Sequence, residues 1–471
     1  MTTRRGAGGA PIAALAAAAV SLTALVVPPA PAQVPQAQPD TGPRGATVPW
    51  RLDRSLTEVF ESSTLVIPAL SLFAGEVPVR LQLERMQVWK PGARVTEIGS
   101  GGERTLHKPT ARRHFQGRVA GEEDSLAFLA VDAEGRWRGL VSAQEQLFLL
   151  ATPRGGAAAI ELAAVGPIAA DWSCGNSALP APLRGSSSVS TVAAPGNAIS
   201  GRGAGRPTAA DLAVETDAEF FDRLGSASAA SAYVADLVAA VSAIFLRDID
   251  AVPQISDLYL YSGGTSSDPW TATSVVPAVF EVRDYWLANR GEVERSLVHF
   301  LTGKAMGGGV AFVGSLCDTV MGYGVTGEIS GRWEPSNPLA VLDLFTFSHE
   351  LGHTFGSPHT HCYNDSPQPG DPPIDRCWGS QDGCYSGPVS MPVDGGGIMS
   401  YCSLQPGGTS NVSLWLGRAG FYGERSERAP QRMRAYLDSV ASCLPAFVET
   451  IFENGFETGD TSGWDATVGG P

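Results

Sequence analysis

Residues 349–359 read HELGHTFGSPH and have the form HExxHxxGxxH. His349 and His353 are four residues apart, so on a helix their imidazoles lie one turn apart on one face, where they can share a metal ion. Gly356 can adopt a positive φ that ends the helix and turns the chain back. His359 is therefore predicted to be the third ligand.

Three nitrogen ligands leave a fourth position for water, which is typical of a catalytic rather than a structural zinc site. Glu350 directly follows the first ligand and can take the proton of that water as general base. Zinc lowers the pKa of bound water from about 15.7 to about 7, so the water can attack a peptide carbonyl at neutral pH. The motif predicts one catalytic Zn²⁺ ion. We expect His361 to be exposed or to lie behind the ligands, because a fourth nitrogen would close the site.

A second motif lies 40 residues beyond the third histidine, where residues 395–402 read GGGIMSYC. It resembles the Met-turn of metzincin zinc proteases, with Met399 as the hydrophobic floor beneath the metal. Residues 209–443 as a whole resemble the adamalysin/reprolysin group of metzincins, especially its bacterial secreted members. Further matching stretches are 214–217, 220–221, 301–303, 309–317 and 359–362.

The resemblance implies an α/β catalytic domain with a mixed, mostly parallel sheet and long helices. It also implies that the strand near 311–315 is the sheet edge that binds protein or peptide substrates as an extended strand, and that Cys317 pairs with Cys443. Thr360 stands where many relatives carry Asp. Glu215 matches an acidic residue through which some relatives bind calcium, but no aspartate is evident just before Leu301, so calcium binding is left open.

The region 50–152 alternates apolar and polar residues in short runs, which predicts antiparallel strands. Its stretch 115–121, FQGRVAG, resembles a reprolysin-type propeptide, and the β-rich propeptide is placed at 33–174. Cys174 is then a candidate cysteine switch whose thiolate fills the fourth position on zinc; the alternative is a free or partly buried thiol. Removal of the propeptide would leave six cysteines, an even number that suits three disulfides.

The N-terminal end of the chain and its middle carry processing signals. Residues 1–32 have a basic start, an apolar stretch and a small-x-small site, as in a signal peptide. Residues 175–208 form a Ser/Gly/Ala/Pro-rich linker with candidate cleavage sites at Arg184, Arg202 and Arg206. Residues 444–471 form a C-terminal tail. We expect a zymogen secreted to the extracellular space or periplasm, with no membrane anchor in its mature form.

The composition limits the partners. A net charge of −15 disfavours nucleic acid and anionic membranes, and we expect a monomer that acts on proteins or peptides. Other hypotheses are an exopeptidase, which the Met-turn opposes, a structural zinc site, which the three-histidine set opposes, and a catalytically silent binding or adhesion module with the metzincin fold. Glu350 argues against the last, because metal binding alone needs no base there.

Overall fold

The computed structural model describes residues 55–72, 77–143, 146–152, 160–168, 173–179, 207–265 and 267–447. The predicted signal peptide, most of the predicted linker and most of the C-terminal tail lie outside these residues. All the described residues belong to one compact unit, which spans residues 44–471.

The first sheet is antiparallel and follows the short helix α1 (Leu56–Glu61). It has seven strands in the order β1-β2-β5-β6-β7-β8-β9. Their bounds are β1 (Thr64–Leu70), β2 (Val79–Met86), β5 (Arg113–Val119), β6 (Leu126–Val131), β7 (Trp137–Ala143), β8 (Gln146–Ala151) and β9 (Glu161–Ala164). The expected β-rich N-terminal region is thus present, because short apolar–polar runs separated by turns favour consecutive antiparallel pairing.

The second sheet is mixed and mostly parallel, with eight strands in the order β10-β14-β15-β13-β11-β12-β3-β4. Its bounds are β3 (Trp89–Ile98), β4 (Arg104–His107), β10 (Ser173–Cys174), β11 (Thr208–Thr216), β12 (Ala251–Tyr261), β13 (Leu297–Leu301), β14 (Gly308–Ala311) and β15 (Tyr323–Thr326). β3, β4 and β10 come from the predicted propeptide region, so this sheet takes strands from both sides of the predicted linker. The domain boundaries themselves stay a prediction.

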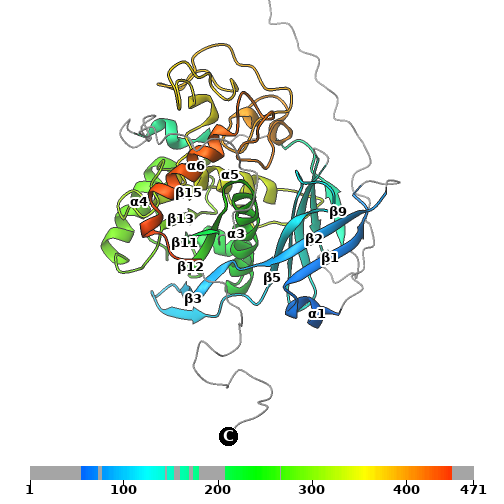
Figure 1. The fold of residues 1–471 in the computed structure, drawn as a ribbon. Coiled ribbons are helices and arrows are strands. Elements are labelled where there is room, and N and C mark those ends of the chain that lie inside the picture. Colours follow the sequence, from blue (N-terminus) through cyan, green and yellow to red (C-terminus); the bar gives the residue numbers. More distant parts are fainter. Residues whose placement is uncertain are drawn as a thin grey trace, which may run out of the picture. The chain divides into compact units, whose positions relative to one another are not determined.

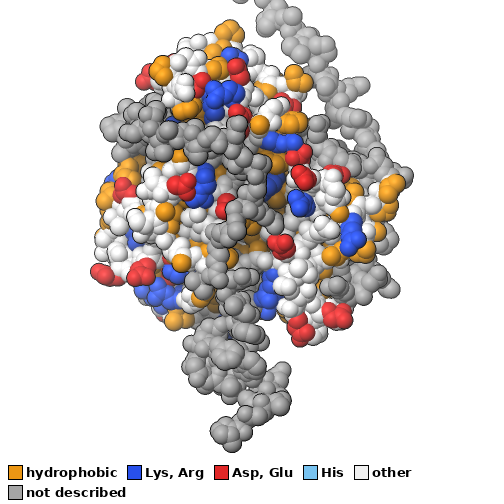
Figure 2. All heavy atoms as spheres, viewed as in Figure 1, with side chains coloured by type: hydrophobic (Ala, Val, Ile, Leu, Met, Phe, Trp, Pro, Cys, Tyr) orange, Lys and Arg blue, Asp and Glu red, His pale blue; other side chains and the backbone are white. Residues whose placement is uncertain are grey.

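Helices cover both faces of the second sheet. They are α2 (Ala218–Leu224), α3 (Ala227–Ile249), α4 (Val275–Asn289), α5 (Ala340–Thr354) and α6 (Arg428–Ser439). α4 shares a hydrophobic core with one face of the sheet, and α3 and α5 share a core with the other. In Figure 1, α3 stands between the second sheet and the first. On the face shown in Figure 2, acidic, basic and hydrophobic side chains are interspersed.

Apart from α6, the chain beyond α5 forms loops and single turns, as the abundance of Gly, Pro and Cys predicts. The single turns are η3 (Thr360–Cys362), η4 (Cys402–Leu404), η5 (Gly408–Asn411) and η6 (Ala441–Cys443). Disulfides hold this region: Cys317–Cys443, Cys362–Cys384 and Cys377–Cys402. The expected Cys317–Cys443 pair is confirmed, the four loop cysteines pair among themselves, and Cys174 is a buried free thiol.

Candidate metal centre

Helix α5 places three of the predicted site residues. His349, Glu350 and His353 are completely buried, and the spacing of four residues puts both imidazoles on one face of the helix. The helix ends at Thr354, and Gly356 adopts φ +101°, as the motif predicts. This turn lets His359 approach the same point, with its Nε2 atom 3.1 Å from that of His353.

Each of the three histidines donates its Nδ1–H to an oxygen behind it. His349 donates to the Ile398 carbonyl at 2.7 Å, His353 to the Ser357 carbonyl at 2.7 Å, and His359 to Gln381 Oε1 at 2.9 Å. An imidazole whose Nδ1 carries the proton presents an Nε2 lone pair, and such contacts orient metal-ligating histidines. The tautomer of each ring therefore follows from its hydrogen bond.

The electrostatics of the group favour a cation. Burial lowers the pKa of all three imidazoles, that of His353 to about 4, so they are neutral and able to ligate at pH 7. Two Nε2 lone pairs 3.1 Å apart repel each other unless a cation lies between them. Ligand bonds of about 2.0–2.1 Å in tetrahedral geometry put two nitrogens about 3.3 Å apart, so the histidines present fit a zinc-sized ion.

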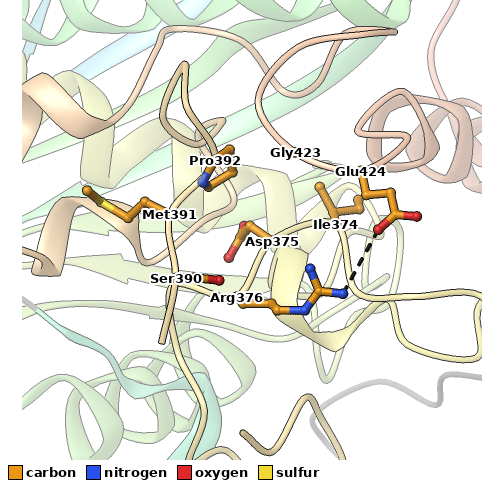
Figure 3. A pocket seen from close by; sticks show the side chains of 8 residues that line it. All are labelled: Ile374, Asp375, Arg376, Ser390, Met391, Pro392, Gly423 and Glu424. Carbon is orange, nitrogen blue, oxygen red and sulfur yellow. Dashed lines mark ion pairs between the residues drawn. The ribbon is translucent and has the colours of Figure 1, made fainter. Parts of the chain in front are cut away.

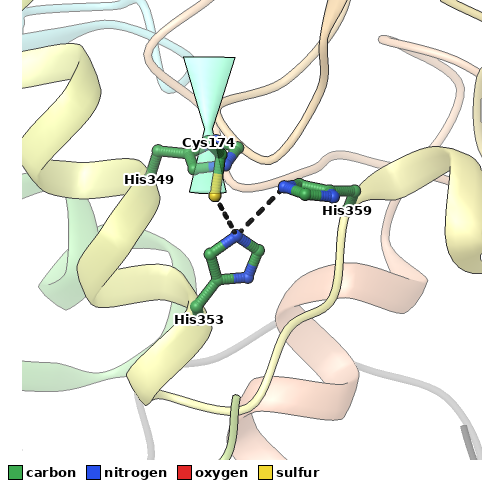
Figure 4. A group of neighbouring side chains, drawn as sticks. All are labelled: Cys174, His349, His353 and His359. Atoms are coloured by element: carbon green, nitrogen blue, oxygen red, sulfur yellow. Dashed lines mark hydrogen bonds between the residues drawn. The ribbon is translucent and has the colours of Figure 1, made fainter. Parts of the chain in front are cut away.

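Cys174 completes a four-residue group with the three histidines, whose candidate ligand atoms all lie within 4.8 Å of one another. Its sulfur is 3.4 Å from His353 Nε2 and 3.5 Å from Glu350 Oε2. Figure 4 shows it on β10, pointing toward His353 from above, with α5 on one side and the loop that carries His359 on the other. Burial, and next the Glu350 carboxylate, raise the pKa of the Cys174 thiol well above its usual value.

The segment around Cys174 lies along the sheet edge that the resemblance assigns to substrate. β10 pairs in parallel with β14, with Cys174 opposite Gly309. The next residues form the turn η1 (Gly175–Ala178), where Asn176 Nδ2 donates to the Ala311 carbonyl at 3.0 Å. Tyr401 donates its hydroxyl to the Cys174 carbonyl at 3.1 Å. The edge strand is 308–311, slightly earlier than the expected 311–315.

Glu350 is enclosed as tightly as the ligands. Its neighbour across the edge strand is Gly309, where an added Cβ would lie 2.5 Å from Glu350 Cγ. A side chain at position 309 would therefore displace the carboxylate. Burial raises the pKa of Glu350 well above its usual value. A carboxyl group with a raised pKa, beside the histidines and the thiol, suits proton transfer.

Met399 and Thr360 lie beneath the histidines. Met399 is fully buried against Gly352, the helical residue between the two ligand positions. Thr360 donates its backbone N–H to the Met399 carbonyl at 3.0 Å. The Thr360 hydroxyl donates to the same carbonyl at 3.2 Å, and the buried Asp375 carboxyl accepts from the Cys377 N–H at 2.9 Å.

Sequence reasoning missed Gln381. Its Oε1 accepts from His359 Nδ1 at 2.9 Å and lies 2.7 Å from His361 Nε2. His361 is completely buried next to His359, not exposed. The only available signal was the position of Gln381 between Cys377 and Cys384, which does not reveal a loop folded back onto the histidines. Asn176 was also missed, inside the predicted linker.

Two other features lie away from the histidines. Glu215, the candidate calcium residue, is buried and paired with Arg290, and it accepts from Trp286 Nε1 at 2.8 Å. A pocket of about 150 Å³ lies in the loops, where Figure 3 shows Arg376 paired with Glu424. None of the eight residues that line this pocket belongs to the histidine group.

The fold and site together define a metallopeptidase-like α/β protein with a β-rich N-terminal region. Residues 206–413 match the family model described as Metallo-peptidase family M12, of reprolysin type. This part of the chain is accordingly similar to metzincin-like metalloproteases. The match ends before α6 and excludes the first sheet.

No curated protein matches the chain. Among solved structures, metalloproteinase-II from Bacteroides fragilis is 11% identical, with 81% of this chain and 93% of that chain covered and a TM-score of 0.36. A chain from a structure described as a chaperone-substrate complex is 14% identical, with 51% of this chain covered and a TM-score of 0.30. This chain spans 36% of that chain's length. Both similarities are distant.

Proposed function

We propose that the chain is the latent form of a secreted zinc-dependent endopeptidase, with His349, His353 and His359 as ligands and Glu350 as the general base. The observation that carries the proposal is the convergence of three Nδ1-bonded histidines on one point beside a buried carboxyl group. Zinc held there would act as a Lewis acid and lower the pKa of a water molecule to about 7.

The protein's own residues would perform the remaining tasks. Glu350 would hold the proton removed from the attacking water and pass it to the leaving amine. β14 would bind the substrate backbone as an added strand, since its outer edge is the one that β10 now occupies. Met399 would support the histidines from below as a Met-turn. The three disulfides favour an oxidising compartment such as the extracellular space.

Latency follows from Cys174. Its sulfur lies between Glu350 and His353, where the water and the substrate carbonyl would have to be. With zinc bound, the thiol would ligate as a thiolate despite its raised pKa, because a bound cation deprotonates a coordinating thiol. We propose that Cys174 is a cysteine switch and that β10 must leave the edge before a substrate strand can bind.

The test compares the full-length wild type with Glu350→Gln, each alone and combined with Cys174→Ala, before and after a protease cuts the linker. Casein hydrolysis and zinc content are measured for every form. We expect about one zinc in each protein, more hydrolysis by Cys174→Ala than by the uncut wild type, and none by any Glu350→Gln form. If every cut or Cys174→Ala form that retains Glu350 binds zinc but hydrolyses none of a broad panel of substrates, the binding-module alternative would be established instead.

A further inference from the structure

Helix α3 is apolar around its whole circumference. It has 23 residues, of which 18 are buried. By length and composition it is the one helix in the described ranges that could cross a membrane, yet 83% of its most apolar window is buried inside the protein. A helix that is hydrophobic on all sides needs cover on all sides. Here β12, α5 and α6 cover one side, and β5 and β6 of the first sheet cover the other.

The first sheet is apolar on the face that covers α3. Along β6, Leu126, Phe128 and Ala130 belong to the hydrophobic core that contains α3, whereas the alternate residues belong to a separate core on the other face. Phe128 packs against Trp333, with ring centroids 5.8 Å apart. Separation of this sheet from α3 would expose two large apolar faces to water, which costs free energy in proportion to their area.

Asp236 identifies the first sheet as the specific partner of α3. Its carboxylate is completely buried in the middle of the helix. It contacts three residues that lie in the first sheet or directly before β5. It forms ion pairs with Arg112 Nε at 2.9 Å and Arg138 Nη1 at 2.9 Å, and it accepts a hydrogen bond from His114 Nε2 at 3.0 Å. The buried Asp236 carboxylate therefore matches only a surface that places basic side chains at these three positions.

The hairpin β3–β4 adds a third connection, at the far edge of the second sheet. β3 pairs in parallel with β12 from Trp89 to Ile98. Ion pairs add to this ladder: Arg94 pairs with Asp257 on β12 at 2.7 Å, and Lys90 reaches Asp211 on the next strand, β11, at 2.5 Å. Without β3, the long strand β12 would become an unpaired edge, which proteins usually cover.

From these contacts we propose that the β-rich region, residues 55–168, is a permanent subunit of the protein that stays bound to residues 207–447 after the linker is cut. All three disulfides join residues beyond the linker, so a cut there leaves two fragments held by non-covalent contacts alone. Because Cys174 precedes the linker, the cut alone would leave the thiol at the histidines. To open the histidine site, only the short segment around Cys174 would then have to be displaced.

The test uses the full chain with a site for a sequence-specific protease placed within 180–206, in a Cys174→Ala background so that the thiol does not hold the fragments together. After complete cutting, size-exclusion chromatography at physiological and at high salt is expected to show one complex that contains both fragments in equal amounts. Elution as two separate fragments at physiological salt would overturn the proposal. This readout does not depend on hydrolysis, so it stands apart from the proposed protease activity.

A matched pair of variants tests the interface itself. Asp236→Lys opposes Arg112 and Arg138 and is expected to speed fragment dissociation by at least about 30-fold. Asp438→Lys, an exposed residue paired with Arg434 within α6, should leave dissociation unchanged. If Asp236→Lys does not fold, Phe128→Ala replaces it, with the same expectation of faster dissociation. Unchanged dissociation in the variant that folds would exclude this face of α3 as the holding surface.

Discussion

Gln381 is the residue on which the orientation of His359 depends. Its amide oxygen accepts from His359 Nδ1 at 2.9 Å. Loss of such a contact behind a metal ligand typically lowers metal affinity about 10–100-fold. We therefore expect Gln381→Ala to weaken zinc binding by about that factor, measured by competition with a chelator of known affinity.

Gln405 provides the control for this change. It lies in the same loop region but donates to the Cys377 carbonyl at 2.8 Å and not to a histidine. Gln405→Ala should leave zinc affinity unchanged. Gln381→Glu should bind zinc at least as tightly as the wild type, because a carboxylate also accepts from Nδ1–H and makes the ring a stronger base. Equal affinity of Gln381→Ala and wild type would show that His359 needs no partner.

His299 predicts a pH dependence of stability away from the metal centre. It is fully buried on β13, beside Phe347 and 2.8 Å from Thr326 Oγ1. Burial lowers its pKa to about 3, against about 6.5 in the unfolded chain. Between these values the unfolded chain binds a proton that the folded protein does not bind. This residue therefore lowers the free energy of unfolding by about 1.4 kcal/mol per unit as pH falls from about 6 to about 4.

The measurement is urea unfolding at several pH values between about 6 and about 4 for wild type and His299→Asn. The variant lacks the titrating group. The slope of its free energy of unfolding against pH should therefore be smaller than that of the wild type by about 1.4 kcal/mol per pH unit. Thr326→Val removes the hydrogen-bond partner and keeps the imidazole, so it should lower stability without flattening the slope. Identical slopes for wild type and His299→Asn would contradict a buried neutral imidazole.

At the scale of elements, the end of α5 depends on Gly356. Its φ of +101° is strained for other residues, and an added Cβ would lie 2.9 Å from Tyr436 Cβ on α6. Gly356→Ala should cost about 1–3 kcal/mol for the backbone and more for the displaced helix. Because this turn carries the chain to His359, zinc affinity should fall as well. Thermal unfolding and chelator competition measure the two effects.

Gly370 provides a control that has the backbone strain of Gly356 without its steric contact. It has φ +90°, and a Cβ added there would have no neighbouring atom within 4 Å. Gly370→Ala should therefore show the backbone cost alone, with zinc affinity unchanged. Similar losses in both variants would mean that the approach of α6 to Gly356 adds nothing.

The strands and helices of residues 207–447 were largely predictable. Apolar residues recur at helical spacing in 229–246 and 341–355, which predicts helices where the structure has α3 and α5. The apolar run 258–261 predicts a buried strand, and it is the end of the longer β12. Its full length was not predicted, because β12 is buried throughout and so lacks the polar–apolar alternation that marks a half-buried strand.

At the scale of the whole molecule, the Cys317–Cys443 bridge ties the C-terminal end of the fold to the region that follows β14. It closes a loop of 126 residues, against 22 for Cys362–Cys384. In the chain-entropy description, loops of these sizes stabilise by about 5 and about 3 kcal/mol respectively. Replacing both Cys317 and Cys443 with Ser should lower the free energy of unfolding by about 2–5 kcal/mol.

Urea unfolding of the double variant, beside a Cys362→Ser/Cys384→Ser double variant, checks this order. The larger loop should give the larger loss. A smaller loss for the 317–443 bridge would show that strain or residual structure outweighs loop closure in this chain. All samples are compared at the same zinc concentration, because bound metal adds to stability.

The sequence by itself predicted the candidate ligands His349, His353 and His359, the candidate base Glu350 and the turn at Gly356, because residues within about three helical turns are related by local geometry alone. Only the tertiary structure decided that Gln381 supports His359, that Cys174 lies against Glu350, and that β3 extends the second sheet. These contacts join residues up to 176 positions apart, and the path of the chain between them is set by how the two sheets and α3 pack. That packing cannot be inferred from the spacing of residues in the sequence.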